Sequence, residues 1–262
     1  MSGQAKPVSR QGKITQFFLL IYQAFAFVTR FFKEAFIPPF HFREFIRQCY
    51  NVGYKSLALI SITGFITGLV FTKQSRPSLA DFGATSWLPS LVAIAIIRAL
   101  APLVTALICA GKVGSNIGAE LGSMKVTEQI DAMEVSAIDP YKYLVVTRVA
   151  ATTIMLPMLM FYTAFVGLMG SYLDIHANEQ TSLISFFQDA FSSINFLDYW
   201  ASIAKALVYG FTIGVVGSYK GFNASNGTTG VGHAANSAVV TSMFLIFIEE
   251  IIIVQITNFI RG

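Results

Sequence analysis

Continuous apolar stretches alternate with short polar segments along most of the chain, and this spacing predicts its elements. Five stretches are long enough for a membrane-spanning helix, which needs about 20 mostly apolar residues. They cover residues 52–72, 87–110, 149–173, 199–219 and 234–260. Their apolar residues run continuously and do not alternate with polar ones as in a membrane strand. The pattern therefore predicts an all-α polytopic membrane protein with five transmembrane helices.

A shorter apolar stretch, Ile14–Thr29, precedes these five. It holds 16 uncharged residues and is rich in Phe and Tyr, which is typical of a helix that lies in the membrane interface. We therefore expect an interfacial (elbow) helix within a cytoplasmic N-terminal region, 1–51, followed by a transmembrane domain, 52–262. The alternative is that Ile14–Thr29 crosses the membrane. Pro38-Pro39 ends the helix, because proline lacks the amide that a helix interior needs.

The few charged residues are distributed unevenly between the two sides of the membrane. Only 12% of residues are charged and 54% are hydrophobic, which excludes most soluble enzymes, since soluble domains carry about 25% charged residues. Segments 1–55, 112–148 and 220–233 hold eight, four and one Lys or Arg, and the segments on the other side hold two, none and one. The positive-inside rule then makes the N-terminus cytoplasmic and the C-terminus external, provided that Ile14–Thr29 does not cross. The net charge of +4 reflects this orientation and predicts no nucleic-acid partner.

Glycines recur at a spacing that lets helices approach closely. Three pairs stand four residues apart, a pattern typical of helix–helix contacts in membranes. These pairs are Gly64 and Gly68, Gly114 and Gly118, and Gly210 and Gly214. The spacing predicts packing, within one subunit or between subunits, and says nothing about a substrate.

The loop after the second span contains a predicted amphipathic helix. Its apolar face is formed by Val126, Ile130, Met133 and Ala137. Thr127 is a candidate N-cap, and Asp139-Pro140 ends the helix, because a residue before proline disfavours helical geometry. Two interpretations stay open for this helix. It is either a solvated connector between spans or an acidic docking helix for a partner with a basic groove.

Four charged residues lie inside the predicted spans, where a charge is costly and normally faces a cavity or a partner. They are Arg98 in the second span, Lys205 near one end of the fourth, and the neighbours Glu249 and Glu250 in the fifth. We expect Lys205 to extend its ammonium group to the interface. The other three suggest an ion pair between spans, a polar cavity for an anionic headgroup, or a proton relay in an ion- or proton-coupled secondary transporter. The two glutamates point about 100° apart on a helix, so we expect that they do not face one partner together.

The sequence contains no motif for catalysis or for a cofactor. Cys49 and Cys109 lack a CxxC spacing, and His41, His176 and His233 are far apart, so no metal site is predicted. A phosphate-binding GxxxxGK[ST] loop is also missing from the sequence, so ATP hydrolysis would have to reside in another subunit. We therefore expect a transport subunit rather than an enzyme, with no cofactor of its own.

A series of short motifs runs from the second span into the following loop. Arg98 and Pro102 come first, and then follow Ala-Gly-Lys-Val-Gly-Ser at 110–115, Ala-Glu-Leu-Gly-Ser-Met at 119–124, Glu-Gln-Ile-Asp-Ala-Met at 128–133 and Asp-Pro at 139–140. Together these motifs resemble the MlaE/YrbE family, the permease subunits of ABC transporters that work with MCE-domain lipid-binding proteins. The resemblance covers about residues 43–260.

The resemblance implies a function and a set of partners. Two copies would form a homodimer in a bacterial inner membrane, with phospholipid held between them by the first, second and fifth spans. A cytoplasmic ABC ATPase dimer would hold ATP and Mg²⁺, and a periplasmic oligomer of MCE-domain proteins would cap the outer side. The helix from Glu120 to Asp139 would be the coupling helix that sits in a groove of the ATPase. Its expected coupling residues are Glu120, Lys125, Glu128, Asp131, Glu134 and Asp139.

The same resemblance makes Arg98, Glu249 and Glu250 candidates for lining the lipid cavity. The family often has a glutamate directly after the arginine of the second span, where this chain has Ala99. Without that neighbouring carboxylate, we hypothesise that Arg98 pairs with Glu250 between the second and fifth spans.

Overall fold

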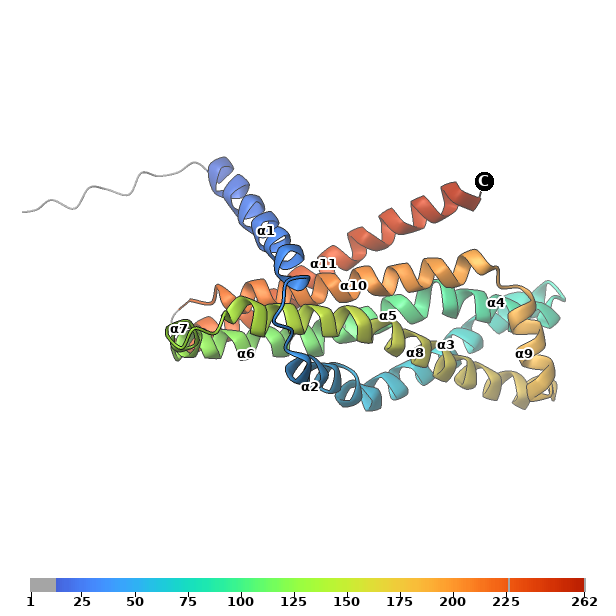
Figure 1. Ribbon diagram of the computed structural model, residues 1–262. Coiled ribbons are helices and arrows are strands. Elements are labelled where there is room, and N and C mark those ends of the chain that lie inside the picture. Colours follow the sequence, from blue (N-terminus) through green and yellow to red (C-terminus); the bar gives the residue numbers. More distant parts are fainter. Residues whose placement is uncertain (1–12, 226, 262) are drawn as a thin grey trace, which may run out of the picture. The chain divides into compact units, whose positions relative to one another are not determined.

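The structure, a computed structural model, describes residues 13–225 and 227–261. This part of the chain is built from helices and contains no strand (Figure 1). Short 3-10 turns (η1, η2) and π-helical segments (η3, η4, η5) interrupt or join the α-helices. In chain order the elements are α1 (Lys13–Ala35), α2 (Phe42–Val52), η1 (Tyr54–Ser56), α3 (Leu57–Asp81), η2 (Thr85–Trp87), α4 (Leu88–Ala95), η3 (Ile96–Leu100), α5 (Ala101–Cys109), η4 (Ala110–Gly114), α6 (Ser115–Val126), α7 (Gln129–Val135), η5 (Tyr141–Val146), α8 (Thr147–Glu179), α9 (Leu183–Ser192), α10 (Phe196–Phe222) and α11 (Thr228–Arg261).

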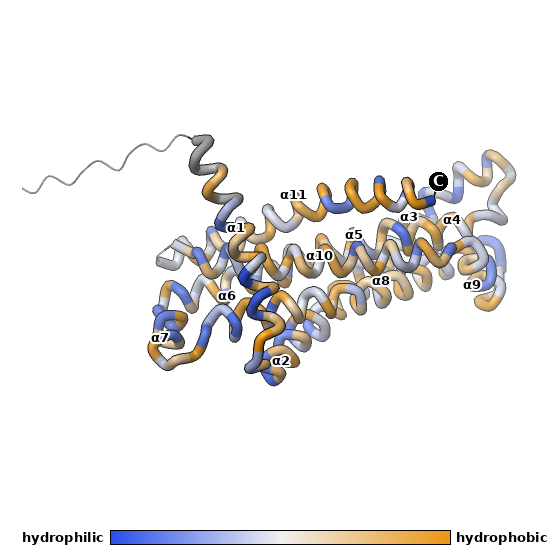
Figure 2. The backbone as a smooth tube through the Cα atoms, turned by 45° about the horizontal axis from the view of Figure 1, so that its top comes forward, coloured by the Kyte–Doolittle hydropathy of each residue, from blue (hydrophilic) through white to orange (hydrophobic). Residues whose placement is uncertain are grey.

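Five helical stretches of the described chain are long and apolar enough to cross a membrane. They are Phe42–Asp81, Thr85–Val126, Tyr141–Glu179, Phe196–Phe222 and Thr228–Arg261. Each contains one predicted span, so the prediction of an all-α polytopic membrane protein is confirmed. Figure 2 shows hydrophobic residues along these stretches and hydrophilic residues gathered around α7.

The chain divides into two compact units, one ending at Phe40 and the other beginning at His41. In the first unit α1 is a single helix that is not among the membrane-crossing stretches. The second unit holds α2 to α11, and α2, which the sequence placed with the N-terminal region, packs against α8. Its polar residues Glu44 and Gln48 are buried and hydrogen-bonded to each other at 2.7 Å.

Helix α8 is the centre of the bundle, because α3, α10, α5 and α2 all pack against it. Close approach to α3 depends on glycine. A methyl group at Gly68 would overlap the backbone of Gly167, and one at Gly170 would overlap the carbonyl oxygen of Phe65. Gly64 likewise lies against Thr163 of α8. The first glycine pair therefore sits at a contact within one copy of the chain.

The other two glycine pairs lie at further helix contacts of the same copy. Gly210 and Gly214 of α10 face the backbone of α8 around Thr152 and Val149. Gly118 of α6 lies against Ala234 and its neighbours in α11, and Gly114 lies close to side chains of both α10 and α11. The spacing alone left open whether these stripes joined one subunit or two, and the geometry places all of them inside one chain.

Capping side chains determine where α9 and α10 begin. Ser182 caps α9 by accepting the amide of Ser185, and α9 buries Phe186 and Ala190 next to α4. This short helix lies in the segment between the third and fourth spans, for which no helix was predicted. Asn195 and Asp198 form a reciprocal capping box at the start of α10, which fixes Asp198 in the first turn of that helix.

Candidate functional site

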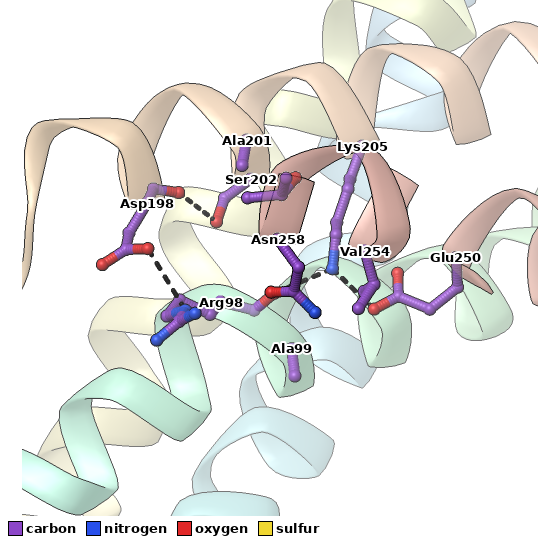
Figure 3. A pocket seen from close by; sticks show the side chains of 10 residues that line it. Arg98, Ala99, Asp198, Ala201, Ser202, Lys205, Glu250, Val254 and Asn258 are labelled. Carbon is purple, nitrogen blue, oxygen red and sulfur yellow. Dashed lines mark hydrogen bonds and ion pairs between the residues drawn. The ribbon is translucent and has the colours of Figure 1, made fainter. Parts of the chain in front are cut away.

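A cavity of about 190 Å³ opens between the second, fourth and fifth spans (Figure 3). Its lining residues come from η3, α10 and α11. They are Arg98, Ala99, Asp198, Ala201, Ser202, Lys205, Glu250, Val254, Thr257 and Asn258. Two of the three predicted cavity residues, Arg98 and Glu250, are therefore in its wall, and Glu249 is not.

The cavity lies where the helical hydrogen bonding of the second span is broken. Pro102 has no amide hydrogen, so the carbonyl of Arg98, four residues earlier, loses its normal helical donor. The helix widens into the π-helical segment η3 at this point. Lys205 fills the vacancy by donating to the Arg98 carbonyl at 3.1 Å, and Ser202 donates to the Ile97 carbonyl at 2.7 Å. Backbone oxygens of the second span thus hold two polar side chains of α10.

Lys205 is buried, with 4% of its side chain exposed, and joins three spans. Besides the Arg98 carbonyl, its ammonium group contacts Glu250 of α11 at 2.6 Å, and the Tyr209 hydroxyl donates to the other oxygen of that carboxylate. The expectation that Lys205 reaches the interface is wrong. Its donors find acceptors inside the bundle, so the side chain gains nothing by extending outward.

Arg98 pairs with Asp198 of α10 at 3.2 Å, and the hypothesis of an Arg98–Glu250 pair is wrong. Asp198 is buried and also pairs with Arg261 at the end of α11. Sequence reasoning missed Asp198 because it assigned residues up to 198 to the loop. The available signal was the Asn-x-x-Asp spacing of a helix start, which moves Asp198 into the fourth span.

Glu249 and Glu250 both reach α10, although they point in different directions from α11. Thr212 donates to Glu249 at 2.5 Å, while Glu250 contacts Lys205 and Tyr209. These three partners lie on one face of α10, so neighbouring glutamates engage one helix at different heights. As expected, the two glutamates do not share a partner residue, but their partners all lie on the same helix, α10. The second oxygen of Glu249 is buried without a hydrogen-bond partner among the described residues.

The second region of interest is the loop between spans two and three, which the sequence predicted to be cytoplasmic. The family resemblance implied one helix from Glu120 to Asp139, and this is corrected, whereas the helix that the residue pattern placed between Thr127 and Asp139 is present in shorter form as α7. The helix of the second span continues as α6 to Val126, where the Thr127 hydroxyl donates to the Ser123 carbonyl and closes it. Glu128 then adopts a left-handed conformation with φ of 58°, which separates α6 from the short helix α7. We call residues 127–139 the coupling segment.

The six predicted coupling residues fall into different environments. Glu128, Asp131 and Glu134 are exposed on the coupling segment, and Lys125 pairs with Asp131 across the turn at 2.9 Å. Asp139 accepts the amide of Tyr141 at 2.9 Å and so begins the third span. Glu120 lies on α6, outside the segment, and is bound to Arg148.

Two apolar residues attach the coupling segment to the bundle. Ile130 is buried in the larger core cluster, and Met133 packs against that cluster. Val135 at the tip is 90% exposed, and Ala137, which the sequence placed on the apolar face, is exposed as well. The segment is therefore anchored on one side and presents acidic groups with one apolar side chain on the other.

The described chain is a multi-pass α-helical membrane protein that holds charged side chains inside its spans. Charged side chains in this position are typical of transport proteins, in which they line substrate or ion pathways.

The comparisons with known proteins then give the family. Residues 45–256 match the family described as permease MlaE, and the chain belongs to this family. It is 36% identical over 223 residues to a probable ABC transporter permease protein of Rickettsia typhi, covering 84% of this chain and 85% of that one. It is 37% identical over 214 residues to a probable ABC transporter permease protein of Synechocystis, covering 79% of each chain.

A plant relative extends the comparison. Protein TRIGALACTOSYLDIACYLGLYCEROL 1, chloroplastic, of Arabidopsis thaliana is 32% identical over 213 residues, which cover 81% of this chain and 61% of the plant protein. The chain is therefore a member of the ABC transporter permease family that includes MlaE, and a multi-pass membrane protein.

Proposed function

We propose that this chain is the membrane subunit of an ABC transporter that moves phospholipids between membranes. Two copies form the core in a bacterial inner membrane, with cytoplasmic N-termini and periplasmic C-termini. A separate ATPase dimer binds ATP and Mg²⁺, and a periplasmic oligomer of MCE-domain proteins receives or supplies the lipid. The family supports this proposal, as does the plant relative, which is named after a glycolipid.

The observation that carries the lipid assignment is the charge at the cavity, whose wall contains Arg98 and Asp198 and beside which Arg261 reaches the same Asp198. Arg98 and Arg261 share the single carboxylate of Asp198, whereas Lys205 and Glu250 neutralise each other. One positive charge is therefore left over at Arg98 and Arg261, each with about a third of its side chain exposed. Guanidinium groups offer paired donors that match the oxygens of a phosphate, and the headgroup of a phospholipid supplies such a phosphate.

The size of the cavity favours a headgroup rather than a whole lipid. At about 190 Å³ it is smaller than the roughly 300–1,000 Å³ of sites for drug-sized ligands. Acyl chains would lie outside it, along the apolar surface of α11, where Phe247, Ile251 and Phe259 are exposed. In this arrangement Glu250 holds Lys205 in place and Glu249 supports the same contact between α10 and α11.

The same surface of α11 is the proposed contact between two copies. Only 17% of its apolar window is buried, against 61% for the fourth span. A second copy facing this surface would enclose lipid between the two fifth spans.

On the cytoplasmic side, the coupling segment docks into a basic groove of the ATPase. Its exposed carboxylates at Glu128, Asp131 and Glu134 supply the charge for this contact, and Val135 supplies an apolar anchor. Closure of the ATPase pair on ATP would then move the ends of the second and third spans.

The alternative function is an ion- or proton-coupled secondary transporter that uses Arg98, Glu249 and Glu250. One observation favours it, the buried oxygen of Glu249 that lacks a partner within the described chain. Against it, Arg98 and Glu250 are both committed to ion pairs. Gradient-driven transport by the purified chain alone in liposomes would decide for this alternative.

The proposed function is tested by purifying the chain from its native membrane and measuring phospholipid transfer. We expect an ATPase and an MCE-domain protein to co-purify and the complex to move fluorescent phospholipid only with hydrolysable ATP. Arg98→Gln should weaken headgroup binding roughly tenfold, the loss expected for a charge-assisted hydrogen bond. A chain that purifies alone, or transfer unaffected by Arg98→Gln, would contradict the proposal.

A further inference from the structure

An ion pair between a buried arginine and a partly exposed glutamate joins the second and third spans next to the coupling segment. Arg148 of α8 has 1% of its side chain exposed, and one guanidinium nitrogen contacts Glu120 of α6 at 2.8 Å. A second nitrogen donates to the carbonyl of Leu144 at 3.0 Å. The pair connects the two helices that enter and leave the coupling segment.

Arg148 is incompletely hydrogen-bonded. Its third nitrogen, Nε, is buried without a hydrogen-bond partner among the described residues, so its charge is held less favourably than in a fully paired site. Glu120 keeps 40% of its side chain exposed, so replacing Arg148 by Met would leave a hydrated carboxylate and no unpaired buried charge. We therefore expect Arg148→Met to keep or raise stability, unlike the removal of Lys205 from its more deeply buried partner.

Glu120 is less accessible than the carboxylates of the coupling segment, with 40% of its side chain exposed against 55% for Asp131. It lies on α6, before the coupling segment begins, and one of its oxygens is taken by Arg148. The resemblance assigned Glu120 to the ATPase contact together with Glu128 and Asp131. The structure separates it from them, because those two lie on the exposed segment and Glu120 lies at its base.

Two further contacts link the coupling segment to the spans on either side of it. The Lys125–Asp131 pair connects α7 to the end of α6, and Asp139 accepts the amide of Tyr141 at the start of the third span. The segment is therefore connected to both α6 and η5, and the Glu120–Arg148 pair connects α6 to α8 just beyond them.

We propose that Glu120 and Arg148 are positioning residues that transmit the movement of the coupling segment jointly to spans two and three. The inference rests on the proposed function, since it concerns how that transporter is driven. Without the pair, the ATPase still docks and hydrolyses ATP, but the two spans respond independently and less lipid moves per ATP.

The test uses the whole complex in lipid nanodiscs, with Glu120→Gln and Arg148→Met as separate variants. Four quantities are measured: ATPase co-purification, ATP hydrolysis, fluorescent phospholipid moved per ATP, and the thermal midpoint of unfolding. We expect unchanged co-purification and hydrolysis, with lipid per ATP lowered roughly five- to tenfold, the lower range of typical coupling between sites. For Arg148→Met the midpoint should stay level or rise while lipid per ATP falls.

A matched control is the buried ion pair at the opposite end of the bundle, Arg76 with Asp174 at 2.7 Å, which joins α3 to α8. Asp174→Asn should lower the thermal midpoint and leave lipid moved per ATP unchanged in the folded complex. This control separates loss of an interhelical pair in general from loss of the pair behind the coupling segment.

Several results would overturn the inference alone. They are wild-type lipid transfer per ATP in both variants, a fall in transfer that only follows a fall in stability, or loss of ATPase co-purification in Glu120→Gln, which would make Glu120 a docking contact. A wild-type complex that shows no ATP-driven lipid transfer would overturn the proposed function and this inference with it.

Discussion

At the scale of single residues, a proline and a helix cap determine which polar groups hold the charges inside the spans. Because Pro102 lacks an amide hydrogen, the Arg98 carbonyl loses its normal helical donor, and Lys205 donates a hydrogen bond to this carbonyl instead. The capping box at the start of α10 holds Asp198 where it meets Arg98. A charge within a span is thus held by backbone and side-chain partners from two other spans, which is how its burial is tolerated.

Removing Lys205 should be more damaging than its single charge suggests. Lys205→Ala leaves Glu250 without its cationic partner, and breaking a buried pair costs about 3–5 kcal/mol of unfolding free energy. Thermal unfolding in detergent measures this loss, with the exposed Lys73→Ala as the control. In a double-mutant cycle, Lys205→Met combined with Glu250→Gln should lose clearly less unfolding free energy than the sum of the losses in Lys205→Met alone and Glu250→Gln alone. Simple additivity of the two losses would argue against coupling.

At the scale of elements, the helices fit together through glycine and are interrupted where function is proposed. Gly68 and Gly167 bring α3 and α8 into backbone contact, and Gly210 does the same for α10 and α8. The second span changes twice into a π-helical form before it continues as α6. The spans pack closely around α8, whereas the polar cavity lies beside the π-helical segment η3, where the second, fourth and fifth spans meet.

The glycine contacts predict opposite outcomes for one substitution at two sites. Gly68→Ala should destabilise by about 1–3 kcal/mol, because the new methyl group overlaps the backbone of Gly167. Gly232→Ala in α11 is the matched change, since nothing lies within 4 Å of the added methyl group. It should stabilise by up to about 1 kcal/mol through better helix propensity. Equal thermal midpoints for the two variants would refute the packing argument.

Charge reversal on the coupling segment should act on the ATPase contact. Asp131→Arg replaces an exposed carboxylate of α7 and also breaks its pair with Lys125. We expect weaker ATPase binding, most clearly at low salt, where surface charges are least screened. Asp81→Asn, an exposed carboxylate in α3, should leave binding unchanged. Titration of the ATPase onto nanodisc-embedded permease gives the affinity, and full binding by Asp131→Arg would contradict the docking assignment.

At the scale of the whole molecule, one span differs from the others in how little of it the chain covers. The fifth span buries 17% of its apolar window, and its exposed residues include Phe244, Phe247 and Ile251. In a membrane this surface faces either lipid or a second copy, and the proposed transporter requires both along the same helix.

Cysteine crosslinking distinguishes a face between copies from one that meets only lipid. After Cys49→Ser, cysteines at Phe244, Phe247 or Ile251 should give disulfide-linked dimers, since crosslinking requires Cα atoms within about 7 Å. Phe165→Cys on α8, equally exposed, should give none. Crosslinks from α8 and none from α11 would move the contact to another face.

The sequence by itself determined the class of protein, its five spans and their glycine stripes. These follow from local composition and from helical periodicity, which each segment carries independently of the others. Helix starts were also readable locally, although the capping signals at Ser182 and at Asn195 with Asp198 were missed.

Only the tertiary structure decided which charges meet. Arg98 pairs with Asp198 rather than with Glu250, Lys205 is buried rather than extended to the interface, and Glu120 binds Arg148. Each of these contacts joins residues far apart in sequence. The partners are selected by the rotation and height at which two helices pack, and neither quantity is encoded in the pattern of a single segment.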